Sequence, residues 1–272
     1  MRGLPANLVI GAVLVGLVVG IAALSLVWTP HEATQMNIRG KFGDPSAQHW
    51  LGTDQLGRDV VSQLMAAARN SMTVALIAVL LGGSIGVALG LLASALGGWV
   101  EEAVMRLADL GFAFPALLFA IMLAAVFGPS LTNAVLAISF INIPVFARIT
   151  RASANQIWTR DYVMAARAAG MSRFAITRDH ILPNVAAPII VQATIEFAVA
   201  ILAEAALSYL GLGAQPPASS WGRMLSEAQT LMFMAPELAI YPGLCIMIAV
   251  LGFSLLGDGL RDITDPRLVR ER

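Results

Sequence analysis

The chain has 272 residues and a formal net charge of zero, with 58% hydrophobic and only 12% charged residues. A soluble domain carries about 25% charged residues, so this composition excludes an ordinary soluble protein. The balanced charge identifies no partner by itself, and nucleic acid is not expected to be one.

Six apolar segments occur along the chain, each about the length that crosses a membrane as a helix. They lie at about 8–28, 72–96, 107–127, 131–149, 186–210 and 236–257. About 20 residues at a rise of 1.5 Å per residue span a hydrocarbon core of about 30 Å. We therefore expect an all-α integral membrane protein with six transmembrane helices, forming a single domain over residues 1–272.

The first segment, from Leu8 to Trp28, is longer than the apolar region of a typical signal peptide. No small-x-small cleavage site ends it, so we expect a retained first span. The third and fourth segments are separated only by "GPSL", which predicts a tight helical hairpin.

The distribution of arginine predicts the orientation. Arginines collect on both sides of residue 160 and in the C-terminal tail; they are Arg148, Arg151, Arg160, Arg167, Arg173, Arg178, Arg261, Arg267, Arg270 and Arg272. Positive loop residues favour the cytoplasmic side, which places residues 150–185 and both termini in the cytoplasm. Residues 29–71 oppose this orientation with Arg39, Lys41, Arg58 and Arg69, although four acids accompany them.

The stretch "RDYVMAARAAGMSRFAITRDHILPN" (160–184) is exposed and cationic, and is predicted to form two short helices. Its alanines favour helix, Gly170 is placed for a left-handed cap, and Ser172 can cap the second helix. Pro183 is expected to end that second helix. A short helix with small side chains suits docking into a groove of another protein. The alternative is an amphipathic loop held by lipid headgroups.

Four stretches resemble one known family. "AARAAG" with "HILPN" (165–170 and 180–184) resembles the EAA loop of bacterial ABC importer permeases, in the version of the dipeptide/oligopeptide/nickel family. "HWLGTDQLGRDVVSQL" (49–64), "LSYLGLGAQPPASSWGRML" (207–225) and "GDGLRDITDPRL" (257–268) are similar to the same family. Their order resembles its C-type subunit, one of two unlike permeases in such a transporter.

The resemblance implies a type I ABC importer permease fold in the bacterial cytoplasmic membrane. The implied partners are a B-type permease, two cytoplasmic ATPases, a periplasmic or lipid-anchored solute-binding protein and membrane lipid. It also implies that the 150–185 loop couples to an ATPase through Ala165, Ala166, Arg167, Ala169, Gly170, Arg173, Leu182 and Pro183. Met164 stands where the family motif has its glutamate.

Polar residues within the apolar segments are candidates for the translocation path, because ionisable groups there usually face a cavity or a partner. Glu204, with Ser208 one turn later, is the leading candidate, and Asn142 beside Pro144 is a second. A structural hydrogen bond to the partner permease is the alternative role for Glu204.

Two surface stretches have local interpretations. Thr53 or Asp54 is expected to cap a helix leading into the second span, with Asp59 favourable to its dipole. Trp221 is expected at the membrane interface, as aromatic residues often are.

No catalytic residue, cofactor or metal site is expected. The one lysine, Lys41, has Gln35 and Phe42 where a P-loop needs glycine and a hydroxyl, so ATP and Mg²⁺ would be bound by partner subunits. Cys245 is alone. His31, His49 and His180 are far apart in sequence, with no ligand spacing.

The expected function is a permease subunit of an ATP-driven importer of small peptides. A nickel-chelate permease of the same family is the alternative. A secondary transporter is less favoured because no internal repeat is found, and a membrane enzyme because no nucleophile or metal set converges.

Overall fold

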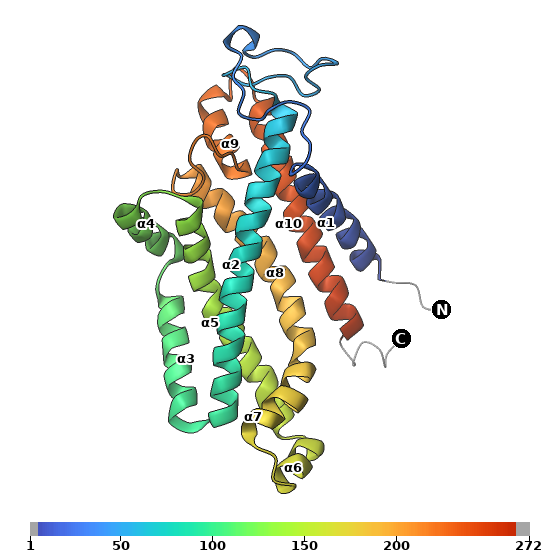
Figure 1. Cartoon of the computed structure of the whole chain (residues 1–272), viewed down its shortest axis with the longest axis vertical. Coiled ribbons are helices and arrows are strands. Elements are labelled where there is room, and N and C mark those ends of the chain that lie inside the picture. Colours follow the sequence, from blue (N-terminus) through green and yellow to red (C-terminus); the bar gives the residue numbers. More distant parts are fainter. Residues whose placement is uncertain (1–4, 265–272) are drawn as a thin grey trace.

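The computed structural model describes residues 5–264, and these residues form helices and loops without a β-sheet (Figure 1). Its α-helices are α1 (Ala6–Leu24), α2 (Val60–Leu96), α3 (Gly98–Ala113), α4 (Ala116–Phe127), α5 (Leu131–Trp158), α6 (Asp161–Ala168), α7 (Arg173–Ile176), α8 (Leu182–Tyr209), α9 (Trp221–Ala228) and α10 (Glu237–Thr264). Short 3₁₀ turns occur at Ile38–Gly40 and Gln229–Leu231, and a π-helical turn at Thr177–Ile181. The tail arginines Arg267, Arg270 and Arg272 lie outside the described residues.

Five helices are long and apolar enough to cross a membrane, and a bent pair makes up to six spans. The five correspond to the predicted first, second, fourth, fifth and sixth segments, although the first helix ends at Leu24, before the predicted residue 28. Most are longer than predicted, because the polar ends that leave the apolar layer stay helical. α2 has 37 residues, about 55 Å at 1.5 Å per residue, and therefore extends well beyond a hydrocarbon core of about 30 Å.

The third segment is not one straight helix, which corrects the prediction for 107–127. α3 and α4 meet at an angle of 82°. Phe114 has extended backbone angles, as expected for a residue that precedes a proline, and Pro115, also extended, is the N-cap of α4. The predicted hairpin turn after α4 is confirmed: Gly128 has a positive φ and the Ser130 hydroxyl caps α5 by accepting from the Asn133 amide.

The centre of the bundle is the contact between α2 and α5. Gly82, Gly86 and Gly90 recur every four residues on α2 and face α5. A Cβ atom on Gly86 would lie 2.5 Å from the Ile143 carbonyl oxygen, so the two backbones approach as closely as glycine allows. Small residues at this spacing are typical of packed membrane helices.

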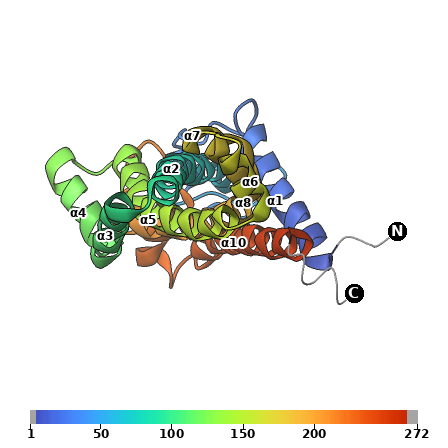
Figure 2. The ribbon, with the colours of Figure 1, turned by 90° about the horizontal axis from the view of Figure 1, so that it is seen from below.

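The remaining helices surround this pair. α1 packs on α10, and α10 packs on α8. Seen along the bundle, α3 and α4 lie on one side and α1 on the other (Figure 2). The 29–59 segment and α9 lie at one end of the molecule, and α6 and α7 at the opposite end (Figure 1).

Two local predictions were wrong. The cap of α2 is Asp59, not Thr53 or Asp54: its carboxylate accepts from the Ser62 amide at 2.8 Å. Trp221 is not an exposed aromatic at the surface but 2% exposed, packed in the core, with its indole N–H donating to the Leu64 carbonyl at 3.3 Å.

Candidate functional site

The loop between α5 and α8 is built around a left-handed glycine turn. α6 ends where Gly170 takes a φ of +83°. The Met171 amide donates to the Ala166 carbonyl and the Gly170 amide to the Arg167 carbonyl, each at 3.1 Å. These two bonds form a Schellman motif, which satisfies carbonyls left open at a helix end. The predicted left-handed cap is confirmed.

The second short helix also begins as predicted but does not end as predicted. The Ser172 hydroxyl accepts from the Ala175 amide at 3.2 Å and so caps α7. The chain then stays helical from Arg173 to Tyr209. Pro183 therefore does not end the helix. It lies directly after the wider π-helical turn, where the hydrogen-bond pattern of the helix is already interrupted.

A small apolar cluster holds the loop against the ends of the spans. Its buried members are Ala154, Val163, Ile176, Ile181 and Val185. They come from α5, α6, α7, the π-helical turn and α8, so each part of the loop is anchored by at least one buried side chain. This cluster is separate from the main core, which lies further along the bundle.

The outer surface of the loop carries large apolar side chains that are about half or more exposed. Phe174 is 76% exposed, Met164 53% and Tyr162 47%. Sequence reasoning missed Phe174 and Tyr162 as surface features. The signal was present, because Val163 and Ala166 already fill the one inward stripe of α6 and leave its other apolar residues outside.

The predicted coupling residues lie mostly on this outer surface. Ala165, Arg167, Ala169 and Gly170 are exposed on α6 and its cap, whereas Ala166 is half-buried against the small cluster. Leu182 and Pro183 are exposed at the start of α8, beyond the π-helical turn.

The two arginines of the predicted set differ in their surroundings. Arg173 donates from Nη1 to the carbonyls of Ala95 and Leu96 at 2.6 and 3.0 Å, so it caps the C-terminal end of α2. A cation is favourable there because the unpaired carbonyl oxygens and the C-terminal end of the helix dipole carry partial negative charge. Arg167 is exposed on α6 and suits a test of docking better than Arg173 does.

Glu204 is fully buried and joins three parts of the chain. Its two carboxyl oxygens accept hydrogen bonds from the hydroxyls of Ser71 on α2 and Ser208 on α8, each at 2.6 Å. The Ser208 hydroxyl oxygen in turn accepts from the Ala214 amide at 3.0 Å, in the loop before α9. These hydrogen bonds lie within this chain and give Glu204 a structural role that the sequence did not predict. A hydrogen bond to the partner permease, and a role of Glu204 and Ser208 in the path, stay predictions.

We expect Glu204→Gln to lower the free energy of unfolding. The glutamine amide has one oxygen and so cannot accept from the Ser71 and Ser208 hydroxyls at both former oxygen positions. Losing one buried hydrogen bond to a carboxylate costs about 1.5–3 kcal/mol. Thermal unfolding of the purified variant measures this loss, with Thr264→Ser at the far end of α10 as the control. Impaired transport by a variant of unchanged stability would contradict the structural role and favour the path.

Asn142, the third path candidate, is 2% exposed and lies where α5 contacts Gly82 of α2. Its side chain is therefore enclosed between two helices of this chain. Its predicted role in the path stays a prediction.

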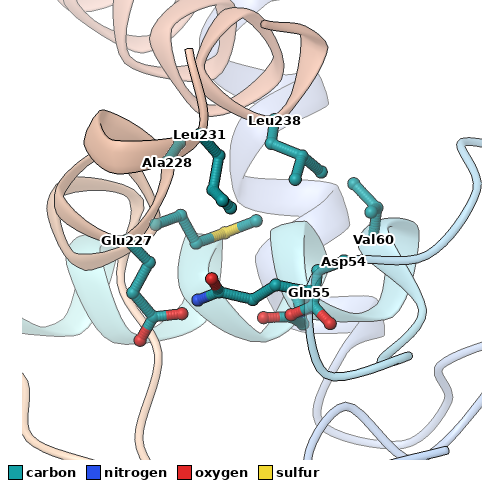
Figure 3. Close-up of a pocket in the computed structure, with 9 residues that line it drawn as sticks. Asp54, Gln55, Val60, Glu227, Ala228, Leu231 and Leu238 are labelled. Carbon is teal, nitrogen blue, oxygen red and sulfur yellow. The ribbon is translucent and has the colours of Figure 1, made fainter. Parts of the chain in front are cut away.

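A charged network joins the 29–59 segment to α9. Arg58 donates from Nε to the Asp54 carboxylate at 2.6 Å and from Nη2 to the Glu227 carboxylate at 2.7 Å. Gln63 donates to Asp54 at 2.9 Å, and Arg223 to Glu227 at 3.0 Å. Figure 3 shows Asp54 and Glu227 on the two sides of a small pocket, with Gln55 between them and Leu231 and Leu238 closing it. The network fixes this end of the bundle.

Comparison with known proteins identifies the family. Residues 82–270 match the family described as "Binding-protein-dependent transport system inner membrane component". The chain is 42% identical to the dipeptide transport system permease protein DppC of Alkalihalophilus pseudofirmus, over 96% of this chain and 86% of that protein. It is 41% identical to the glutathione transport system permease protein GsiD of Pectobacterium atrosepticum, over 93% of this chain and 84% of that protein.

The fold is similar to a chain of the MetNI methionine ABC transporter in an inward-facing conformation. The TM-score is 0.62 at 18% identity, covering 75% of this chain and 97% of that chain. This similarity supports the predicted type I importer permease fold, with one of its spans broken. The family match covers more than half of the chain, and the relatives align over most of it. The chain is thus a multi-pass membrane permease that belongs to the family of inner membrane components of binding-protein-dependent transport systems.

Proposed function

We propose that this permease forms half of the translocation path of an ATP-driven importer for small peptides. The observation that carries the proposal is the loop from α6 to the start of α8, which presents small, apolar and cationic side chains outward at one end of the bundle. The dipeptide and glutathione permeases among its relatives support peptides as the cargo rather than the nickel chelate.

The proposed assembly pairs this chain with a B-type permease and two cytoplasmic ATPases, which bind the ATP and Mg²⁺. A periplasmic or lipid-anchored solute-binding protein delivers the cargo to the opposite end, where the 29–59 segment and α9 lie. Both termini are then cytoplasmic. ATP-driven closure of the ATPase pair would move α6 and, through the small cluster, the ends of α5 and α8.

Met164 has a defined place in this proposal. It stands at the position of the family's glutamate and is 53% exposed, next to the alanines of the docking surface. We propose that an apolar contact, which Tyr162 and Phe174 extend, replaces the polar contact of that glutamate; a polar contact from Asp161 is the alternative.

Charge reversal at Arg167 tests whether the exposed surface of α6 and its cap docks on the ATPase. We expect Arg167→Glu to reduce recovery of the ATPase with the purified permease by at least about tenfold, since reversing a charge at a docked surface costs about 1.4 kcal/mol or more. Arg39→Glu is the matched control, because Arg39 is also exposed but lies at the opposite end. Equal recovery for both variants would favour a loop that contacts lipid only.

The cargo is tested by uptake in cells that lack the native permease genes and express this chain with its partners. Labelled dipeptide should accumulate in an ATP-dependent manner. Accumulation of nickel without dipeptide uptake would instead identify the nickel permease of the same family.

A further inference from the structure

The fold brings together two histidines that are separated in sequence. His31 and His49 lie 18 positions apart, yet their ring centroids are 4.6 Å apart with the planes tilted by 37°. Asp59, the cap of α2, lies beside them. One ring nitrogen of each histidine and one carboxylate oxygen of Asp59 all lie within 4.8 Å of one another. The sequence spacing conceals this cluster because residues 29–59 form a folded segment.

The contacts of the two rings leave one nitrogen of each directed toward the cluster. His31 Nε2 lies 2.8 Å from the Gln48 carbonyl oxygen, which can only accept, so Nε2 carries the proton and Nδ1 keeps a lone pair. The second nitrogen of His31 is thus held by a carbonyl, as is characteristic of metal-binding histidines. His49 Nδ1 lies 2.9 Å from Asp59 Oδ1. An ion bound by these two atoms takes the place of the proton between them, since two donors on one tetrahedral ion lie about 3.3 Å apart.

Asp59 supplies the negative charge that two neutral imidazoles lack. Burial raises its pKa, but hydrogen bonds from the Ser62 hydroxyl and amide and from His49 outweigh burial, so its pKa lies below the ordinary value. Asp59 is 3% exposed, whereas both histidines are partly exposed, so an ion can enter from the solvent side. The cluster thus has its carboxylate on the buried side and its two imidazoles on the side that faces solvent.

The alternative is that the cluster only attaches the 29–59 segment to α2, but this does not explain the second histidine. One hydrogen bond between His49 and Asp59 is enough for attachment. It does not require a second imidazole in contact with the first, since two protonated rings at this distance would repel each other.

We propose that His31, His49 and Asp59 form a binding site for a divalent transition-metal ion of the zinc class. Imidazole nitrogen with carboxylate oxygen suits zinc, nickel and copper ions. Two donors at about 2.0–2.1 Å from one ion lie at most about 4.2 Å apart, so the widest pair must close by roughly 0.6 Å. Side-chain rotation of the partly exposed histidines provides this movement. The bound ion links residues 31, 49 and 59 at the start of α2, whatever cargo the permease carries.

The test is zinc binding to the full-length permease, purified without a histidine tag and titrated with Zn²⁺ against a coloured chelator. We expect one ion per chain. The double variant His31→Ala/His49→Ala should bind at least about 100-fold more weakly, because both nitrogen donors are lost. Asp59→Asn should weaken binding about 10-fold or more and keep the α2 cap, since asparagine also caps helices.

His180→Ala is the matched control, because His180 lies at the other end of the molecule, near Tyr162 of α6. It should bind zinc as the parent does. X-ray absorption of the zinc-loaded parent gives a result that does not depend on any variant folding: it should show imidazole ligands at about 2.0–2.1 Å. Undiminished binding by the double variant, or a zinc spectrum without imidazole, overturns the proposal.

Discussion

Gly86→Ala is expected to destabilise the protein, although alanine normally favours a helix over glycine by about 1 kcal/mol. The new Cβ atom would lie 2.5 Å from the Ile143 carbonyl oxygen and 2.7 Å from the Phe146 Cβ. One of these is a backbone atom inside a helix, so α5 itself must move away from α2. Overpacking of this kind costs about 1–3 kcal/mol, and adjacent layers of the α2–α5 contact would be disturbed as well.

The matched control is Gly20→Ala on α1, where an added Cβ meets nothing within 4 Å. Thermal unfolding and gel filtration in detergent measure the difference. We expect Gly86→Ala to unfold at a clearly lower temperature and Gly20→Ala to unfold at or above the parent's. A Gly86→Ala variant as stable as Gly20→Ala would show that the two helices are less closely packed than described.

Gly170→Val is expected to leave the protein folded but to uncouple transport from ATP hydrolysis by the partner ATPase. Nothing lies within 4 Å of a Cβ at this position, so the effect comes from the backbone alone. A β-branched residue at a φ of +83° is strongly disfavoured, and the turn between α6 and α7 would adopt another shape. In the proposed importer, transport should fall at least tenfold while the partner ATPase still hydrolyses ATP.

Gly170→Asn is the matched control, since asparagine tolerates left-handed angles better than other non-glycine residues. It should retain most of the transport activity. The measurement is the ratio of peptide taken up to ATP hydrolysed in vesicles that contain the complete transporter. Normal coupling in Gly170→Val would exclude a role for this turn in transmitting movement.

Local chemistry explains which parts were predictable from sequence. Gly170 and Ser172 were placed correctly because a helix cap depends on residues within one turn. The spans were found because about 20 apolar residues in succession are a strong signal. The break at Pro115 was missed, since two apolar helices on either side of a proline read as one continuous segment.

The errors arose where the path of the folded chain determines a residue's surroundings. Asp54 accepts from the amides of Leu56 and Arg58 in a turn before the helix, and Asp59 at the start of α2 is its cap. Trp221 has an aromatic ring suited to an interface, but α9 folds back and buries it. The pairing of His31 with His49 likewise depends on the folded path of the segment between them.

The contact of Arg173 with the last carbonyls of α2 has a mechanical consequence. α2 is a single stiff rod of about 55 Å, with Arg173 at one end and Asp59 at the other. We therefore expect a displacement of α7 to shift this end of α2, while the close glycine contact with α5 restrains the helix further along. A rigid helix held in this way tilts, so we expect Asp59 at its other end to move in the opposite direction. The segment that contacts Asp59 would then change position when the loop at the far end of the bundle moves.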